Sequence, residues 1–454
     1  MLEFIYNHSP IPFQNIMVSV KGKLFEKQRY TKHYYNELEI LKECKNPFEL
    51  QEKRLQEFYE YIKNNSPFFN ERLETYGEII ILSELNKFPI LTKEDIRQNI
   101  DKIITKNKTN LIKAATGGST GKSLKFYSDS YDMSRKIAYL DFFKEQHGVK
   151  KGMRRVSIGG KKIIPNKQKK KIFWRFNEPL NQLLFSAYHV NEENLKFYVN
   201  KLNDFKPETL DGYPSVLHRI AKYILKNNVT LKFKPIAIFP TAEALTDEMK
   251  GNIEKAFGCP VRNQYASSEG APFITENSNG NLEICPMTGV FELKQIQGKI
   301  YELIVTGFYT TTTPIFRYKI GDSVELFKEL PKNYTQKDIK IKRIIGRNND
   351  YITTRDKRLI TSVNLVSAVK MVGTKLVESQ FIQNKLEEIE VKLVMSDDNF
   401  DKDRVISTLK KELKDRVGNE VNFNIYFVDE IEKTNRGKKR FIINNLNKGE
   451  IKNE

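Results

Sequence analysis

The sequence predicts an α/β protein in which a large multi-layer N-terminal α/β domain precedes a small α+β C-terminal domain. Strand-like and helix-like segments alternate through the middle of the chain, as is typical of α/β folds. From about residue 341 the order of the segments changes. The 454 residues also exceed what one hydrophobic core usually organises. We therefore predict domains over residues 1–346 and 347–454.

The N-terminal part of the large domain, residues 1–84, is predicted to be helical. Apolar residues recur three and four positions apart in segments 35–44 and 55–63. That spacing places them on one face of a helix. We expect these helices to continue to about residue 75.

The middle of the chain alternates strands and helices. Proline is favoured in the first turn of a helix, so Pro214 marks the start of one. Thr246 is a suitable N-cap, and Gly258 stops the helix that follows. Together these signals predict a largely parallel sheet. The expected strands are 209–213, 235–240 and 261–265, and the expected helices are 214–226 and 247–257.

The small domain is predicted from a second succession of segments. A helix of roughly 15 residues lies between two strand-like runs, which is typical of a compact α+β unit. Its boundary is expected near residues 347–350. Strands are expected at 342–346, 389–395 and 421–428, and helices at 362–370 and 401–417.

Composition narrows the class of protein. The formal net charge of +19 suits nucleic acid, an anionic membrane surface or an acidic polymer, and a biased composition explains it equally well. Three widely separated cysteines, Cys44, Cys259 and Cys285, argue against a disulfide framework or a Cys-rich zinc site and favour a reducing cytoplasm. We find neither a membrane-spanning apolar run nor a signal-peptide pattern.

The segment ATGGSTGKS, residues 115–123, is the most informative part of the sequence. A Gly/Ser/Thr-rich loop exposes backbone N–H groups that can surround phosphates. It is not a Walker A motif, because Thr116 stands where that motif has its first Gly and because LKFYSD then alternates like a strand. We predict a phosphate-binding loop between two strands. Taken alone, an ordinary hairpin turn has the same composition.

Three further segments carry residues suited to nucleotide chemistry. In YASSEG, after a predicted strand, the aromatic ring can stack on a base and Glu269 can hold Mg²⁺. In PIFRYKIGD, the Asp322 carboxylate can accept both ribose hydroxyls, although an aspartate that caps a turn is the commoner case. In KTNRGKKRF, Lys438 lies in a Gly-loosened basic loop, as a mobile charge donor would, or is simply solvated.

In this order, the segments resemble the adenylate-forming superfamily of acyl-CoA synthetases and ligases, luciferases and peptide-synthetase adenylation domains. The match to Y-G-x-[ST]-E has Ala266 in place of Gly. DGYPSVL, FRYKIGD and GKKRFII are similar to the phenylacetate–coenzyme A ligase-like branch, and within it to members associated with capsular polysaccharide biosynthesis. The five matching segments are 116–123, 265–269, 316–322, 346–350 and 437–440.

The resemblance implies a role for each matching residue. The β- and γ-phosphates would be held by Thr116, Gly117, Gly118, Ser119, Thr120, Gly121 and Lys122. The adenine and its surroundings would involve Tyr265, Ala242, Glu243, Ala244 and Ser268. Asp322 would bind ribose, Arg347 ribose or phosphate, Glu269 Mg²⁺, and Asp350 would lie at the hinge. The catalytic set would be Lys438, Glu269 and Thr120, with Lys438 contacting the substrate carboxylate and the α-phosphate.

The resemblance further implies ATP- and Mg²⁺-dependent activation of a small carboxylic acid as an acyl-adenylate, with release of pyrophosphate. A mobile C-terminal domain would deliver Lys438 and then rotate so that coenzyme A or an amine can accept the acyl group. No zinc is assigned, because segment 276–291 lacks the extra Cys and His of some branch members. The acid pocket is expected to include Tyr188, Tyr213, Pro240, Ala266 and Ser267.

The expected location is cytoplasmic, with peripheral contact to an anionic membrane or glycan, and nucleic acid is the least favoured partner. Part of the positive charge is expected around the triphosphate, on Lys122, Arg317, Arg347 and Lys438. The basic run at 161–171 is expected to be a solvated loop. The alternative function is a non-catalytic nucleotide-binding or scaffold protein derived from the same fold.

Overall fold

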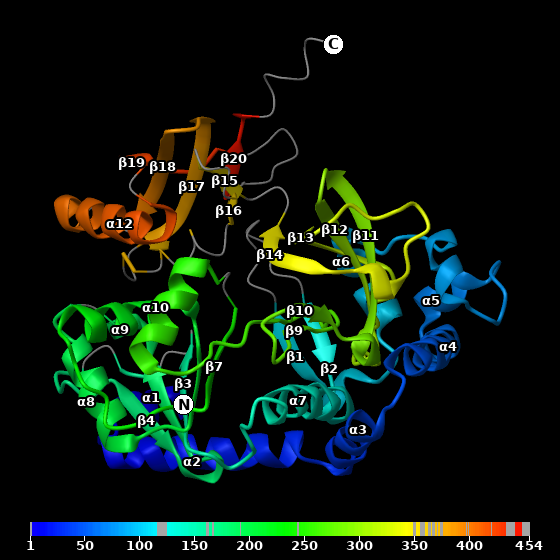
Figure 1. Cartoon of the computed structure of the whole chain (residues 1–454), viewed down its shortest axis with the longest axis horizontal. Coiled ribbons are helices and arrows are strands. Elements are labelled where there is room, and N and C mark those ends of the chain that lie inside the picture. Colours follow the sequence, from blue (N-terminus) through cyan, green and yellow to red (C-terminus); the bar gives the residue numbers. More distant parts are fainter. Residues whose placement is uncertain are drawn as a thin grey trace.

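The structure is a computed structural model of the whole chain (Figure 1). It describes most of the 454 residues. Outside the described residues lie 1, 116–124, 160–162, 166–167, 191, 243–244, 348–350, 355–358, 362–364, 366–367, 370, 373–375, 396, 398, 419, 433–440 and 447–454.

The N-terminal region is helical, as predicted. Side-chain caps explain where several helices begin: Thr31, Asn46, Ser66 and Thr92 each accept a backbone N–H of the first turn that follows. The helices are α1 (Leu2–His8), α2 (Ile11–Arg29), α3 (Lys32–Glu43), α4 (Pro47–Asn65), α5 (Pro67–Leu73) and α6 (Lys93–Ile103).

A five-stranded sheet forms one half of the large domain. Its order is β4 (Trp174–Asn177), β5 (Gln182–Ser186), β3 (Arg155–Gly159), β6 (Thr209–Gly212) and β7 (Ala237–Pro240), parallel except for β4. The helices that pack with it are α8 (Leu195–Phe205), α9 (Pro214–Lys226) and α10 (Asp247–Phe257). Pro214 does open α9, Thr246 caps α10, and Gly258 ends α10 in the left-handed conformation. These local predictions are confirmed.

The prediction that residues 261–265 form a third parallel strand is wrong. Val261 makes only a single bridge to Ile238 of the parallel sheet. The strand itself is short, β8 (Gln264–Tyr265), and pairs antiparallel with β9 (Ile274–Glu276) in the other sheet. The chain reverses between β8 and β9. Strand β8 therefore pairs with β9, its neighbour in sequence, and does not extend the parallel sheet.

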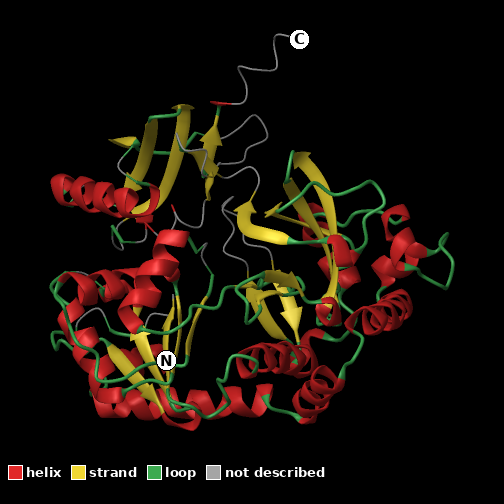
Figure 2. Cartoon of the chain, viewed as in Figure 1, coloured by secondary structure: helices red, strands yellow, loops and turns green. Residues whose placement is uncertain are grey.

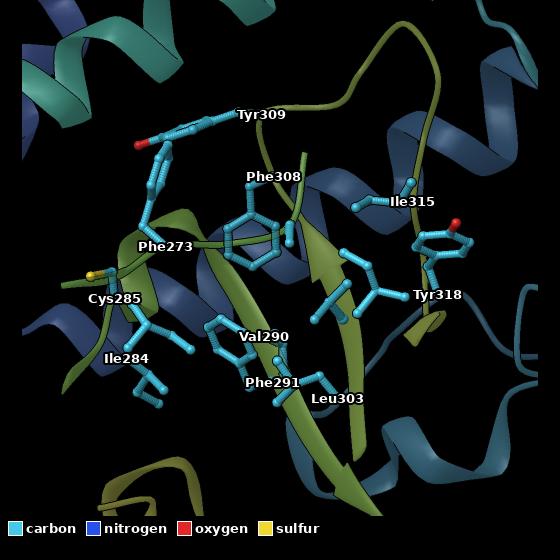
Figure 3. Close-up of a cluster of buried hydrophobic side chains, with 14 of the residues drawn as sticks. Phe273, Ile284, Cys285, Val290, Phe291, Leu303, Phe308, Tyr309, Ile315 and Tyr318 are labelled. Carbon is cyan, nitrogen blue, oxygen red and sulfur yellow. The ribbon is translucent and has the colours of Figure 1, made fainter. Parts of the chain in front are cut away.

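The second half of the large domain is a seven-stranded antiparallel sheet. Its order is β11 (Gly289–Gln297), β12 (Ile300–Gly307), β13 (Tyr318–Leu326), β14 (Ile341–Arg347), β10 (Leu282–Ile284), β9 and β8. Figure 3 shows aromatic side chains, among them Phe273, Phe291 and Phe308, gathered in the core on this sheet. The hairpin of β1 (Ile112–Ala115) and β2 (Lys125–Ser128) stands apart.

Helix α7 (Ser130–Glu145) packs against elements of both sheets. Phe143 contacts Phe239 of β7 edge-on, with ring centroids 5.4 Å apart. Tyr139 stacks on Phe273, next to β9, at 4.6 Å. Large aromatic surfaces buried on both sides therefore hold the two halves in one orientation.

The C-terminal region has a hydrophobic cluster of its own, drawn from residues between 352 and 442. Its helix is α12 (Lys402–Val417), and the predicted helix at 362–370 lies largely outside the described residues. The domain boundary after residue 346 stays a prediction. The strands are the pair β15 (Tyr351–Thr353) and β16 (Leu359–Thr361), and the sheet β19 (Asn422–Phe427), β18 (Glu388–Met395), β17 (Leu376–Lys385) and β20 (Ile442–Asn444). In Figure 2, α12 crosses the lower part of this sheet, on the side toward α9 and α10.

A buried ionic cluster centred on Glu37 joins the N-terminal helices to both α7 and the segment after β12. The Glu37 carboxylate lies 2.8 Å from Arg54 Nη2 and 3.0 Å from Arg135 Nε, and it accepts the Tyr309 hydroxyl at 2.6 Å. Burial by itself raises the pKa of Glu37, but Arg135 and Arg54 outweigh it and hold this pKa below its ordinary value. The ionised carboxylate therefore stabilises the fold.

Replacing Glu37 by Gln should lower the free energy of unfolding by about 3–5 kcal/mol, because Arg54 and Arg135 would stay buried without their anion. The depressed pKa means that this contribution is present above the ordinary value of 4.5 and is lost as pH falls through the folded-state value. Thermal and denaturant unfolding across pH 3–7 would measure it. Glu39→Gln, on the exposed side of α3, is the control and should change stability little. A Glu37→Gln variant as stable as the wild type at pH 7 would contradict the role.

Candidate active site

Three residues predicted to bind the nucleotide lie on strands β8, β13 and β14 of the seven-stranded sheet. Tyr265 ends β8, and its hydroxyl donates to Asp322 Oδ2 on β13 at 2.8 Å. Arg347 on β14 is the cross-strand partner of Asp322. Residues from three separate motifs are therefore neighbours, and their roles toward ATP stay predictions.

The loop after β8 holds Glu269 in a fixed place. Ser267 Oγ accepts the N–H groups of Gly270, at 3.1 Å, and Ala271, at 2.9 Å. The Glu269 side chain is buried and accepts the Ser268 hydroxyl at 3.2 Å. Gly270 has φ +95°, and a Cβ there would lie 2.3 Å from Thr310 Cγ2. Only glycine lets this loop pass so close to the segment after β12.

That neighbouring segment, the four threonines at 310–313, was missed by sequence reasoning. The fully buried Asp132 of α7 accepts the Thr311 N–H at 2.9 Å, the Thr311 hydroxyl at 2.8 Å and the Thr312 N–H at 2.9 Å. The Thr313 hydroxyl donates to Tyr127 O, at 2.8 Å, and accepts Tyr127 N–H, at 2.9 Å. The segment thus links α7 to β2, the strand that follows the Gly-rich loop. The run TTTT just before FRYKIGD was the available signal.

Sequence reasoning also missed Lys136 as a residue of the candidate site. It lies on α7 one turn after Asp132, and its ammonium is 3.1 Å from where a Cβ on Gly270 would stand. Burial lowers its pKa, with Asp132 and Asp129 acting in the opposite direction. Those two carboxylates bond elsewhere: Asp132 to the threonines and Asp129 to Lys106 at 2.5 Å. Within the described part of the chain, Lys136 makes no ion pair, so a cation stands beside the Glu269–Gly270 loop.

The Gly-rich loop and Lys438, the lysine predicted to be catalytic, lie outside the described residues. The two strands predicted to flank the loop are confirmed: β1 and β2 pair antiparallel, with Ala115 opposite Lys125. Ala242 is exposed and has φ +66°. The predicted site residues outside the described ranges are Thr116, Gly117, Gly118, Ser119, Thr120, Gly121, Lys122, Glu243, Ala244, Asp350 and Lys438.

Part of the predicted acid pocket is brought together by the parallel sheet. Tyr213 follows β6 and Pro240 ends β7, at the carboxyl ends of neighbouring strands. The Gln264 amide donates to Pro240 O at 3.3 Å and connects this edge to β8 and to Ala266 and Ser267. Tyr188 lies in the turn Ala187–His189 after β5. The role of this group in acid binding stays a prediction.

The expectation that Arg317 faces a triphosphate is wrong. Its guanidinium pairs with Glu292, with Nε at 2.9 Å and Nη2 at 2.6 Å from the carboxylate, and donates to Asn86 O at 3.0 Å. Arg317 is buried and has φ +49°. Charged groups removed from water need partners within the protein, and Arg317 has them in Glu292 and the Asn86 carbonyl.

A single carboxylate fits the predicted Mg²⁺ role. Mg²⁺ usually takes one or two carboxylates together with substrate phosphates, and Glu269 can supply one. Across the described ranges, no cluster of three His, Cys, Asp or Glu side chains forms a self-sufficient metal site. Any Mg²⁺ here would therefore depend on the nucleotide phosphates for its other ligands.

The C-terminal region contacts the large domain through charged residues of α9 and α12. Glu412 of α12 is buried between Arg219 of α9 and Arg416, whose Nη1 lies 2.5 Å from it. Lys222 and Asp415 form an outer pair at 3.8 Å. In Figure 1, α12 lies above α9 and α10. These ion pairs hold the small domain against the five-stranded half of the large one.

The two-part architecture and its sheets are those of adenylate-forming CoA ligases. The structure is similar to a crystal structure of 2-hydroxyisobutyryl-CoA ligase in the postadenylation state with R3-HIB-AMP: the TM-score is 0.54 at 16% identity, over 87% of this chain and 89% of that chain. The same enzyme with 2-HIB-AMP and CoA in the thioesterification state gives a TM-score of 0.55 at the same identity and coverage. At this identity, the likeness establishes the fold.

Sequence comparison gives the family. The chain is 65% identical over 449 residues to Protein CapK of Staphylococcus aureus, covering 98% of this chain and 100% of that protein. Residues 352–445 match the family model of the CapK C-terminal domain. The chain belongs to the CapK family, and the resemblance inferred from the motifs is confirmed. Among the described residues, no helix is long and apolar enough to span a membrane.

The motifs predict that this site binds ATP, and Asp132→Asn should then weaken that binding by about tenfold or more. In the observed geometry an amide cannot accept from both Thr311 and Thr312, so the 310–313 segment would lose its position. Isothermal titration with ATP would measure the affinity, and thermal unfolding the accompanying loss of stability. Asp141→Asn is the control. Like Asp132→Asn, it removes a carboxylate from α7. Asp141 is half-buried and accepts the Tyr34 hydroxyl, and it does not contact the threonines. Equal ATP affinity in wild type and Asp132→Asn would refute the positioning role.

Proposed function

We propose that this protein is an ATP- and Mg²⁺-dependent ligase that activates a small carboxylic acid as an acyl-adenylate and then transfers the acyl group. The observation that carries the proposal is the contact between Tyr265 and Asp322, from two separate motifs, within the fold of a CoA ligase. Glu269 lies four residues after Tyr265, in the loop that follows β8. That ligase was crystallised with acyl-AMP ligands and with CoA. The acceptor here is coenzyme A or an amine.

The proposed chemistry needs positioning and positive charge, with no nucleophilic side chain. The acid carboxylate attacks the α-phosphorus of ATP, a new C–O–P link forms, and pyrophosphate leaves. Asp322 would hold the ribose hydroxyls while Tyr265 lies against the base. Negative charge grows on the phosphoryl oxygens, so Lys438 and the Gly-rich loop would stabilise the transition state. Mg²⁺, when bound near Glu269, supplies charge neutralisation between phosphates.

We further propose that the enzyme acts in surface polysaccharide biosynthesis. The support is the 65% identity to Protein CapK together with the branch-specific segments FRYKIGD and GKKRFII. In such a pathway, the acyl group would be joined to an amine of a sugar or of a lipid-linked glycan. Coenzyme A remains the competing acceptor.

An ATP–pyrophosphate exchange assay across aryl, fatty, amino and dicarboxylic acids tests the proposal. Lys438→Ala should reduce exchange by about 100-fold or more while ATP binding is retained, because one charge on the developing phosphoryl anion is removed. Lys439→Ala, its neighbour in the same basic loop, is the matched control and should keep most activity. Full exchange by Lys438→Ala would refute the lysine's role. No exchange with any acid, together with intact ATP binding, would favour a non-catalytic nucleotide-binding protein.

The position of Lys136 supports a proposal about the charge of the carboxylic acid substrate. Its ammonium stands beside Gly270 without an anionic partner among the described residues, next to the loop that carries Glu269. A desolvated cation is stabilised by an anion from the ligand. We propose that the substrate carries a second anionic group, which Lys136 receives while the reacting carboxylate faces the nucleotide.

Lys136→Met should change substrate preference, because it keeps the length of the side chain and removes the charge. Pairs of acids that differ only in a terminal carboxylate or methyl group, such as succinate and butyrate, would be compared in exchange assays. The wild type should favour the dicarboxylate, and the variant should lower this preference about tenfold or more. Lys136→Arg, which keeps the charge, should preserve the preference. An unchanged ratio in Lys136→Met would contradict the assignment.

A further inference from the structure

Helix α2 exposes the apolar side chains that a surface helix usually buries. Phe13, Ile16, Val20 and Leu24 are 48%, 57%, 58% and 57% exposed. Their spacing of three, four and four residues places them in one stripe along the helix. We call these four residues the α2 stripe. A contiguous exposed apolar patch on a folded protein marks an interaction surface.

Polar side chains outside the stripe fix α2 against β4 and the turn after it. Gln14 is buried, and its Oε1 accepts Arg175 Nε at 2.7 Å. Asn15 Oδ1 accepts the Phe176 N–H at 3.1 Å, and Ser19 Oγ accepts the Glu178 N–H at 3.2 Å. These bonds prevent the helix from rotating its apolar stripe inward.

The charges around the stripe are mostly positive. Helix α2 contains one acidic residue, Glu26, which pairs with Lys23 at 2.8 Å. Its basic residues are Lys21, Lys23, Lys27 and Arg29. Lys21, Lys23 and Lys27 are exposed, and the whole chain carries +19. An apolar stripe with basic neighbours is the chemistry of helices that lie in the interface of an anionic bilayer. A two-fold contact between copies would instead bring two like-charged surfaces together.

Helix α2 lies at the edge of the molecule opposite the C-terminal region. In Figure 1, α2 runs along the lower edge, and α12 with the C-terminal sheet lies at the opposite, upper edge. Contact with a flat surface through α2 would therefore leave the C-terminal region on the side away from that surface.

We propose that the α2 stripe docks this protein on an anionic membrane surface. The four apolar side chains enter the boundary between headgroups and acyl chains, and Lys21, Lys23 and Lys27 contact acidic headgroups. The helix lies in the plane of the membrane. The inference does not depend on the proposed ligase activity, and it gives part of the +19 surplus a local use.

Co-sedimentation of the full chain with vesicles tests the proposal. Phosphatidylcholine vesicles would be compared with vesicles that also contain phosphatidylglycerol. The wild type should bind the mixed vesicles about tenfold or more tightly than the neutral ones, and rising salt should weaken this binding. Failure to bind mixed vesicles at low salt would overturn the proposal.

Two variants separate the apolar and the charged contributions. Ile16→Ser/Val20→Ser/Leu24→Ser should lose vesicle binding about tenfold or more, as should the charge reversal Lys21→Glu/Lys23→Glu/Lys27→Glu, which leaves the stripe intact. The control Ile79→Ser/Phe327→Ser removes exposed apolar side chains at 80% and 53% exposure elsewhere and should bind like the wild type. Circular dichroism would confirm that each variant is folded.

Either variant binding as the wild type does would overturn the proposal. Sedimentation velocity would run in parallel. A wild-type dimer that the serine variant dissociates, without vesicle binding, would show instead that a second copy covers the stripe.

Discussion

The arrangement of the large domain depends on the buried carboxylate of Glu37. It joins Arg54 of α4, Arg135 of α7 and Tyr309 after β12, residues that are far apart in sequence. Arg135 also donates to Phe308 O at 3.0 Å, and Arg54 to Met287 O at 2.6 Å. Such a cluster is favourable only when every member is satisfied, so it selects one relative placement of these elements.

Helix α7 transmits this placement to the candidate active site. Along its length it carries Asp132, which holds the 310–313 segment, Lys136 beside Gly270, and Tyr139 stacked on Phe273. Further along, Lys144 pairs with Asp211 of β6 at 2.6 Å. One rigid helix therefore sets the distance between the parallel sheet and the antiparallel sheet. The Glu269 loop lies where those sheets approach each other, which explains why a site can form at their junction.

The positive surplus has several distinct uses. Arg54, Arg135 and Arg317 are structural, because each is buried against a carboxylate. The basic run at 161–171 is mixed: Ile163 and Ile164 within it are buried, while residues 169–171 are exposed. The lysines of α2 lie on the surface beside an apolar stripe. Net charge alone could not separate these cases, because burial and pairing decide what a given cation can bind.

The sequence by itself determined the local features. Pro214, Thr246 and Gly258 mark helix ends through steric and hydrogen-bonding preferences of single residues, and the strands around the Gly-rich loop follow from alternation. The motifs also identify Tyr265 and Asp322 as candidate site residues, although no motif predicts the contact between them. Only the tertiary structure decided that β8 joins the antiparallel sheet, that Arg317 pairs with Glu292, that Lys136 faces Gly270 and that four apolar side chains of α2 face outward. Each of these depends on partners that no local pattern encodes, because packing between distant segments selects them.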